Sequence, residues 1–146
     1  MIFNSYQVKP IVFVGKYHDV VETLLQKHVN LLKPKVIWIE YRTIPILSIA
    51  RSFSNFQFFE QIYFLEIKTF DILSQLLQSR ALPTIYQEAF STLIIDVPLY
   101  FSFPIDFHVR FQELMRRITI ILIMDELVLP QTQINLIRVE KKCSSN

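Results

Sequence analysis

The stretch "IVFVGKYHDVVETLLQKHVNLL", residues 11–32, contains the kind of unit from which the whole fold is predicted to be built. Four consecutive apolar residues lead into Gly15 and Lys16, and apolar residues then recur at helical spacing over residues 18–32. A short, continuously apolar run is typical of a strand buried on both faces, and the spacing that follows it is typical of an amphipathic helix. The predicted buried face of this helix holds Val21, Leu24, Leu25, His28 and Leu32.

The same alternation continues along the chain. Short apolar runs occupy residues 35–41, 62–66, 92–96 and 118–124, and helical spacing occupies residues 70–78 and 107–117. Strands that alternate with helices predict an α/β fold, with a mostly parallel sheet, flanking helices and right-handed crossovers. Residues 134–140 alternate apolar and polar side chains and follow "LPQTQ" closely, so we expect an antiparallel edge strand at the C-terminal end.

The composition predicts a single domain that needs a partner. A chain of 146 residues is long enough to bury one core, and we assign residues 1–140 to that domain and residues 141–146, "KKCSSN", to a polar tail. The chain is 51% hydrophobic, with 13 Phe and a single Gly. One small domain cannot bury so much apolar surface, and the excess predicts an obligate subunit of a larger assembly.

Neither a membrane nor a secretory function is predicted. The most apolar run, "ITIILIM" at residues 118–124, is bounded by charged residues after seven residues, whereas a spanning helix needs about 20. Lys9 and Pro10 interrupt the N-terminal segment before any long apolar run develops, so we expect no signal peptide and an intracellular protein.

The turn at Gly15 and Lys16 has the outline of a phosphate-binding loop but lacks its parts. A P-loop needs GxxxxGK[ST], since successive backbone N–H groups wrap the phosphates and the hydroxyl holds Mg²⁺. Here a single Gly is followed at once by Lys16 and Tyr17, without Ser or Thr. We therefore interpret Gly15 as permitting a tight strand-to-helix turn, with Asp19 near the start of the helix.

No other motif predicts a catalytic, cofactor-binding or metal-binding residue. Asp96 ends the run "TLIID" as a Walker B carboxylate does, but without a phosphate cradle we assign it to capping the following turn. The three histidines are far apart in sequence, and Cys143 is the only cysteine, which gives no zinc pattern. The chain also contains no G-x-S-x-G elbow of a hydrolase.

The order of elements over residues 62–126 resembles the core of RecA-like recombinases. The segment "IYFLEIKTFDILSQLLQSRALPTIYQEAFSTLIID", residues 62–96, is similar to that family's strand, its "QLLQ" helix, its second helix and its Walker B strand. The segment "FQELMRRITIILIMDEL", residues 111–127, is similar to the helix and strand that close the ATPase sheet. The resemblance covers roughly half of the chain and implies a minimal RecA-like ATPase core without Walker A, with Asp96 as a degenerate Walker B residue.

A nucleotide-free RecA-like chain of this length most resembles the recombinase paralogues of the fungal Shu complex, and its length suits their smallest subunit. The resemblance implies a non-catalytic, cofactor-free scaffold subunit in the nucleus. Its partners would be sister paralogues and a SWIM-domain zinc protein. Its role would be to promote recombinase filament assembly on single-stranded DNA, in homologous recombination and error-free damage bypass.

Two sets of residues follow from this resemblance and from the composition. Residues 53–64 are rich in aromatic side chains and contain no Lys or Arg, which favours protein contact over nucleic-acid stacking. The predicted partner interface comprises Phe56, Phe58, Phe59, Tyr100, Phe101, Phe103 and Phe107. The predicted DNA contacts, to phosphates without base reading, are Arg110, Arg116, Arg117, Lys141 and Lys142.

Two other classes of protein remain open on the sequence. One is a RecA-like subunit of the Elongator type, which serves tRNA modification in a hexameric ring. The other is a small doubly wound enzyme, whose ligand would bind beyond the carboxyl ends of the strands, near Gly15, Tyr41 and Asp96.

Overall fold

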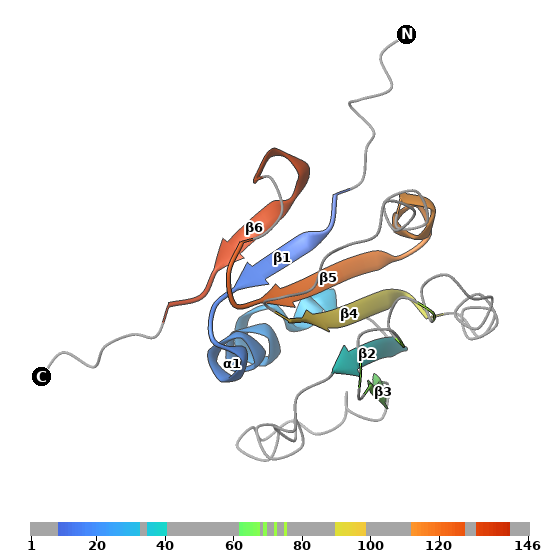
Figure 1. The fold of residues 1–146 in the computed structure, drawn as a ribbon, viewed down its shortest axis with the longest axis horizontal. Helices are drawn as coiled ribbons and strands as arrows, with labels where there is room; N and C mark the ends of the chain where they lie inside the picture. Colours follow the sequence, from blue (N-terminus) through green and yellow to red (C-terminus); the bar gives the residue numbers. More distant parts are fainter. Residues whose placement is uncertain are drawn as a thin grey trace, which may run out of the picture.

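The structure, a computed structural model, contains one parallel β-sheet with a helix packed across one of its faces (Figure 1). It describes residues 9–32, 35–40, 62–67, 90–98, 112–127 and 131–140, together with residues 69, 72 and 75. The strands are β1 (Ile11–Val14), β2 (Val36–Glu40), β3 (Ile62–Glu66), β4 (Thr92–Val97), β5 (Thr119–Met124) and β6 (Asn135–Arg138). The helices are α1 (Tyr17–Lys27) and the 3₁₀ turns η2 (Val29–Leu31) and η4 (Gln131–Gln133), and residues 112–115 are also helical.

The six strands have the order β3-β2-β4-β5-β1-β6, and every neighbouring pair is parallel. All residues of β2 and β4 are buried, which agrees with their continuous Val, Ile and Leu content. Because the strands run the same way, residues that precede strands gather at one edge of the sheet and residues that follow strands gather at the other (Figure 1). We call these the amino edge and the carboxyl edge.

Helix α1 covers one face of the sheet through three residues of its predicted face and two residues, Tyr17 and Val20, that were not predicted. Its buried residues are Tyr17, Val20, Val21, Leu24 and Leu25. The helix begins with the bond from the Val20 N–H to the Lys16 carbonyl (2.9 Å), and the His28 N–H closes its last turn on the Leu24 carbonyl (3.2 Å). Asp19 in the first turn and Lys27 in the last turn both suit the helix dipole.

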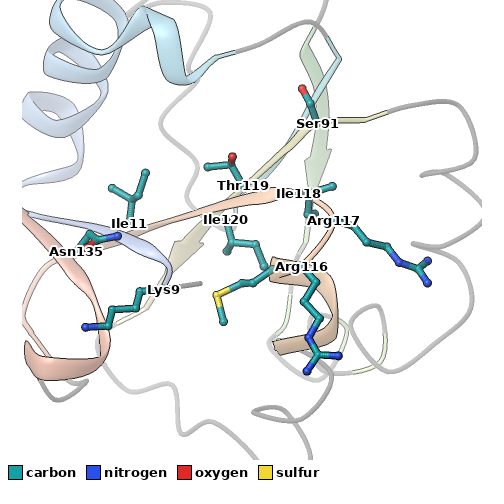
Figure 2. Close-up of a pocket in the computed structure, with 10 residues that line it drawn as sticks. Lys9, Ile11, Ser91, Arg116, Arg117, Ile118, Thr119, Ile120 and Asn135 are labelled. Atoms are coloured by element: carbon teal, nitrogen blue, oxygen red, sulfur yellow. The ribbon is translucent and has the colours of Figure 1, made fainter. Parts of the chain in front are cut away.

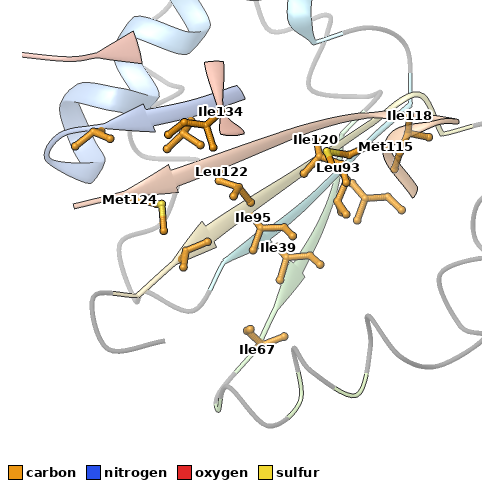
Figure 3. Packing of buried hydrophobic residues seen from close by; sticks show 14 residues of the cluster. Ile39, Ile67, Leu93, Ile95, Met115, Ile118, Ile120, Leu122, Met124 and Ile134 are labelled. Carbon is orange, nitrogen blue, oxygen red and sulfur yellow. The ribbon is translucent and has the colours of Figure 1, made fainter. Parts of the chain in front are cut away.

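The core forms two layers because alternate strand residues point to opposite faces. On the face of α1, Phe13, Trp38, Ile94 and Ile123 pack against the helix. On the other face, shown in Figure 3, Ile39, Leu93, Ile95 and Leu122 pack with side chains from outside the strands. These additional side chains come from Met115, Ile118 and Ile134.

The five apolar runs are confirmed as strands, and the helix predicted over residues 18–32 is confirmed as α1 followed by η2. Its predicted face is buried at Val21, Leu24, Leu25 and Leu32, and the ring of His28 meets Phe13 edge-on at 5.2 Å. Of the helix predicted at 107–117, residues 112–115 are helical. Most of the helix predicted at residues 70–78 lies outside the described residues, as does the tail 141–146.

The predicted antiparallel strand at the C-terminal end is wrong in direction. Strand β6 is an edge strand, but it pairs with β1 and runs parallel to it. The bonds from the Asn135 N–H to the Pro10 carbonyl (3.0 Å) and from the Val139 N–H to the Val14 carbonyl (2.8 Å) fix this pairing. The physical reason is that β5 ends at the carboxyl edge and β6 begins at the amino edge, whereas a tight hairpin would start the second strand where the first one ends.

No helix within the described residues is long and apolar enough to span a bilayer. The structure thus offers no candidate transmembrane helix in the part of the chain that it describes.

Candidate functional site

The carboxyl edge places two carboxylates level with each other on neighbouring strands. Glu40 is the last residue of β2, and Asp96 lies one residue before the end of β4. Since Ile39 pairs with Ile95, the next position on each strand brings Glu40 beside Asp96, with the strands about 4.8 Å apart. Trp38 and Ile94 point toward α1, and the two-residue alternation points both carboxylates to that same face.

Tyr17 joins this pair from the start of α1. Its hydroxyl donates a buried hydrogen bond to Oε2 of Glu40 at 2.6 Å, across 23 residues of sequence. In the sheet, β5 and β4 separate β1 from β2, so a side chain that begins after β1 and reaches Glu40 must cross the end of β4, where Asp96 lies. We call Tyr17, Glu40 and Asp96 the carboxyl-edge cluster.

All three members of the carboxyl-edge cluster are buried. The exposed fraction is 2% for Tyr17, 9% for Glu40 and 0% for Asp96. Burial raises the pKa of the Tyr17 phenol far above its usual value, and the hydrogen bond to Glu40 and the negative charges of Glu40 and Asp96 raise it further. Tyr17 therefore remains a neutral hydrogen-bond donor over the whole physiological pH range.

The pKa of the Glu40 carboxyl group is set by opposing effects. Burial raises the pKa of its carboxyl group above the usual value, the hydrogen bond from Tyr17 opposes that rise, and the charge of Glu66 adds to it. Glu66 pairs with Glu40 across β3 and β2, so it is the neighbour from which this repulsion comes. The donor on Tyr17 thus offsets part of the free-energy cost of burying a carboxylate at this edge.

The connection between β1 and α1 is too short to wrap a phosphate as a P-loop does. Only Gly15 and Lys16 separate the two elements, and Lys16 is exposed. A Cβ atom at Gly15 would lie 2.5 Å from the carbonyl oxygen of Val139, so the backbone after β6 packs directly against the turn. The prediction that Gly15 permits a tight turn is confirmed, and the reason is this close approach by the residue that follows β6.

The described residues contain no group of three or more His, Cys, Asp and Glu side chains that is arranged to hold a metal ion. Within the carboxyl-edge cluster, the hydrogen bond from Tyr17 to Glu40 ties the first residue of α1 to the last residue of β2.

A second feature lies at the amino edge, where a pocket of about 490 Å³ contains two of the predicted DNA contacts (Figure 2). Arg116 and Arg117 lie on one side of this pocket and Lys9 lies on the other. We call it the amino-edge pocket. Its described lining residues are Lys9, Ile11, Ser91, Met115, Arg116, Arg117, Ile118, Thr119, Ile120 and Asn135.

The remaining predicted site residues lie outside the described residues. This applies to Tyr41 in the enzyme alternative, to Arg110, Lys141 and Lys142 among the DNA contacts, and to the whole predicted partner interface: Phe56, Phe58, Phe59, Tyr100, Phe101, Phe103 and Phe107.

Asp96, Arg116 and Arg117, which were predicted as site residues, lie in these two features, whereas Tyr17, Glu40 and Lys9 were not predicted. Glu40 carried a signal, because it is an acidic residue directly after the buried run "VIWI", where a charge needs a partner. Tyr17 and Lys9 carried none, since their roles depend on which strands become neighbours.

A comparison of the chain with protein-family models found no match, and a comparison with curated protein sequences found none either. The function proposed below therefore depends on the fold, on the two edges of the sheet and on the resemblance described above.

Proposed function

We propose that this chain is a degenerate RecA-like subunit that acts as a non-catalytic scaffold in a nuclear complex of recombinase paralogues, of the Shu type. In that role it promotes assembly of recombinase filaments on single-stranded DNA during homologous recombination and error-free damage bypass. Its partners are sister paralogues and a SWIM-domain zinc protein, and it needs no cofactor of its own.

The observation that carries the proposal is the buried bond between Tyr17 and Glu40 beside Asp96. In a P-loop protein a wrapped loop between the first strand and its helix holds the phosphates, opposite an acidic strand end. Here that loop is reduced to Gly15 and Lys16, and Tyr17 crosses to the acidic strand ends instead. An arrangement that ties helix to sheet where a nucleotide would bind favours a structural subunit over an ATPase.

The sheet order supports a RecA-like core over the two common doubly wound folds. Dinucleotide-binding sheets have the order 3-2-1-4-5-6 and flavodoxin-like sheets have 2-1-3-4-5, so in both the first strand is a direct neighbour of the second, whereas here β4 and β5 lie between β1 and β2. In this chain β5 lies between β1 and β4. In the resemblance to RecA-like recombinases, β5 corresponds to the strand that closes the ATPase sheet. Here β5 pairs on one side with β1, which precedes Gly15, and on the other side with β4, which contains Asp96.

Exposed apolar side chains support the scaffold role. Among the described residues, Tyr63 on β3 is 56% exposed and Ile72 is 40% exposed. Strand β3 is an edge of the sheet, where an aromatic residue is available to a partner. Tyr63 adds a described position to the predicted aromatic interface.

The experiment that tests the proposal is purification of the tagged protein from its native cell, with quantitative mass spectrometry of what accompanies it. We expect recombinase paralogues and a SWIM-domain protein in stoichiometric amounts. Elongator subunits together with bound RNA would replace the proposal with the tRNA-modification alternative. A monomer without partners would overturn the scaffold role and direct attention to the carboxyl-edge cluster as an enzyme site, since a buried carboxyl with a raised pKa is also a feature of catalytic residues.

A further inference from the structure

The parallel sheet separates charge between its two edges. Acidic residues lie at or after the ends of strands and so gather at the carboxyl edge. Among the described residues, the basic residues at this edge are Lys16 and Arg138. The acidic residues are Glu40, Glu66, Asp96, Asp125, Glu126 and Glu140. Basic residues precede strands and so gather at the amino edge. They are Lys9, Lys35, Arg116 and Arg117, and the described acidic residue nearest to them in sequence is Glu113. A polyanion approaching the sheet is therefore repelled at one edge and attracted at the other.

The amino-edge pocket concentrates this positive charge around an apolar floor. Figure 2 shows Lys9 and Asn135 toward one end, Arg116 and Arg117 toward the other, and Ile120 between them. The three cationic side chains are exposed. Within the described residues, no carboxylate forms an ion pair with any of them. The pocket thus offers cations at both ends that the described acids do not neutralise.

The elements that carry these side chains are fixed by backbone hydrogen bonds. The Arg117 and Ile118 N–H groups bond to the Leu114 carbonyl at 2.9 and 3.0 Å, which sets the turn that presents the two arginines. The Asn135 N–H bonds to the Pro10 carbonyl at 3.0 Å, which holds the start of β6 beside the residue that follows Lys9. Cations placed on an ordered backbone lose less conformational entropy when they bind phosphate.

We propose that the amino-edge pocket binds the phosphate backbone of single-stranded DNA, through Lys9 at one end and Arg116 and Arg117 at the other. The choice of single-stranded DNA rests on the proposed function, whereas the choice of a phosphate chain rests on the pocket itself. Cations separated along one surface suit successive phosphates of a strand. The described floor has isoleucine and methionine but no aromatic side chain for base stacking, so we expect contacts with phosphates, which carry no sequence information.

The proposal also locates DNA on the opposite side of the sheet from the usual ligand position. Ligands of open α/β sheets bind beyond the carboxyl ends of the strands. In this chain that edge is acidic and is closed at its centre by the Tyr17–Glu40 bond. DNA bound at the amino edge would not disturb the Tyr17–Glu40 bond at the carboxyl edge.

The test compares two double variants of the purified full-length chain in binding a labelled 20-nucleotide oligo-dT, followed by fluorescence anisotropy. R116E/R117E reverses two charges in the pocket, and K16E/R138E reverses two exposed charges at the carboxyl edge, so the change in net charge is the same. We expect R116E/R117E to weaken binding roughly tenfold or more at low salt, and K16E/R138E to change it less than about threefold. K9E should also weaken binding, although Lys9 is remote from the arginines in sequence.

A salt titration provides a second measurement that does not depend on reversed charges. The variant R116Q/R117Q, verified as folded by circular dichroism, should reduce the slope of log affinity against log salt concentration by about 1.4, which corresponds to two lost contacts with single-stranded phosphates. An unchanged slope would overturn the proposal.

Three other results would also overturn it: equal losses in the two double variants, preference for RNA over DNA, or displacement of the oligonucleotide by inorganic phosphate at equal phosphate concentration. The last result would make the pocket a site for small anions. None of these results bears on which proteins accompany the chain, so failure here is distinguishable from failure of the proposed complex.

Discussion

At the scale of single residues, the bond between Tyr17 and Glu40 is the contact on which most depends. It joins the first turn of α1 to the end of β2 in a buried environment, where an unpaired carboxylate costs far more than it does in water. The neutral phenol supplies the donor, and its raised pKa ensures that it does so at any physiological pH. The pair therefore stabilises the fold at the carboxyl ends of the strands, where open α/β sheets commonly bind ligands.

Tyr17→Phe removes the hydroxyl while retaining the ring. We expect the free energy of unfolding at pH 8 to fall by about 1–3 kcal/mol, because Glu40 is left buried without this donor. Urea denaturation measures the loss. Tyr63→Phe is the matched control, since Tyr63 is 56% exposed and should change stability by less than about 0.5 kcal/mol. Equal effects in the two variants would show that the buried bond contributes nothing.

The raised pKa of Glu40 predicts a specific pH dependence. Between the usual value near 4.5 and its raised value, the folded state binds more protons than the unfolded state, so stability falls as pH rises through this window and is then constant. Glu40→Gln removes this fall and retains an acceptor for Tyr17. We expect the variant to gain stability relative to wild type between pH 4.5 and pH 8 in urea denaturation. Glu126→Gln, at an exposed position, is the control and should leave the fall intact.

Gly15 is required by the close approach of Val139. Gly15→Ala introduces a Cβ atom 2.5 Å from the Val139 carbonyl oxygen, which forces the turn and the end of β6 apart. We expect a loss of about 1–3 kcal/mol in the free energy of unfolding. Lys16→Ala, at the neighbouring exposed position, should cost less than about 0.5 kcal/mol. If Gly15→Ala unfolds at the same urea concentration as wild type, this packing is not tight in solution.

At the scale of elements, the strands could be predicted from the sequence and their partners could not. Runs such as "VIWI" are apolar at every position, which is specific to strands covered on both faces. The direction of β6 depends instead on the edge of the sheet at which the strand begins. The alternation within residues 134–140 is the same for a parallel and an antiparallel edge strand. Arg116 and Arg117 could be predicted as DNA contacts because they are adjacent basic residues in the sequence. That Lys9 lines the same pocket could not be predicted, since this depends on the order of the strands in the sheet.

A proline pair tests the direction and register of β6. The Val139 N–H bonds to β1, and alternation along a parallel ladder turns the Arg138 N–H away from the sheet. Val139→Pro should therefore lower the free energy of unfolding by roughly 1–2 kcal/mol more than Arg138→Pro. Chemical denaturation of the two variants measures the difference. A larger loss for Arg138→Pro would contradict the register described here.

The short connection from β1 to α1 predicts that nucleotides do not bind. A ligand with a Kd of 10 μM, added at 1 mM, would raise the free energy of unfolding by about 2.7 kcal/mol. We expect Mg-ATP at 1 mM to leave the thermal midpoint unchanged, because only Gly15 and Lys16 lie between strand and helix. A rise in the midpoint that Asp96→Asn abolishes would instead show a working nucleotide site.

At the scale of the whole molecule, the sheet places the pocket that we propose for DNA and the surface that we propose for partner proteins on different sides. Its amino edge carries exposed cations around a pocket, and its carboxyl edge is acidic and locked by the Tyr17–Glu40 bond. Its β3 edge exposes Tyr63, whose ring meets Phe90 edge-on at 6.4 Å and is therefore partly positioned before any partner arrives. The proposed DNA pocket and the proposed partner surface can therefore be altered independently of each other.

Separate edges predict that partner binding can be lost without loss of folding. Tyr63→Arg places a cation on the exposed edge strand β3, so we expect recovery of partner proteins with the tagged chain to fall at least several-fold. The thermal midpoint of the isolated chain should change little, since Tyr63 is more than half exposed. Asn30→Arg adds the same charge at an exposed position near α1 and should leave recovery unchanged. Undiminished recovery with Tyr63→Arg would show that the β3 edge is not where the partners dock, because a buried arginine without a matching charge is not tolerated at the centre of an interface.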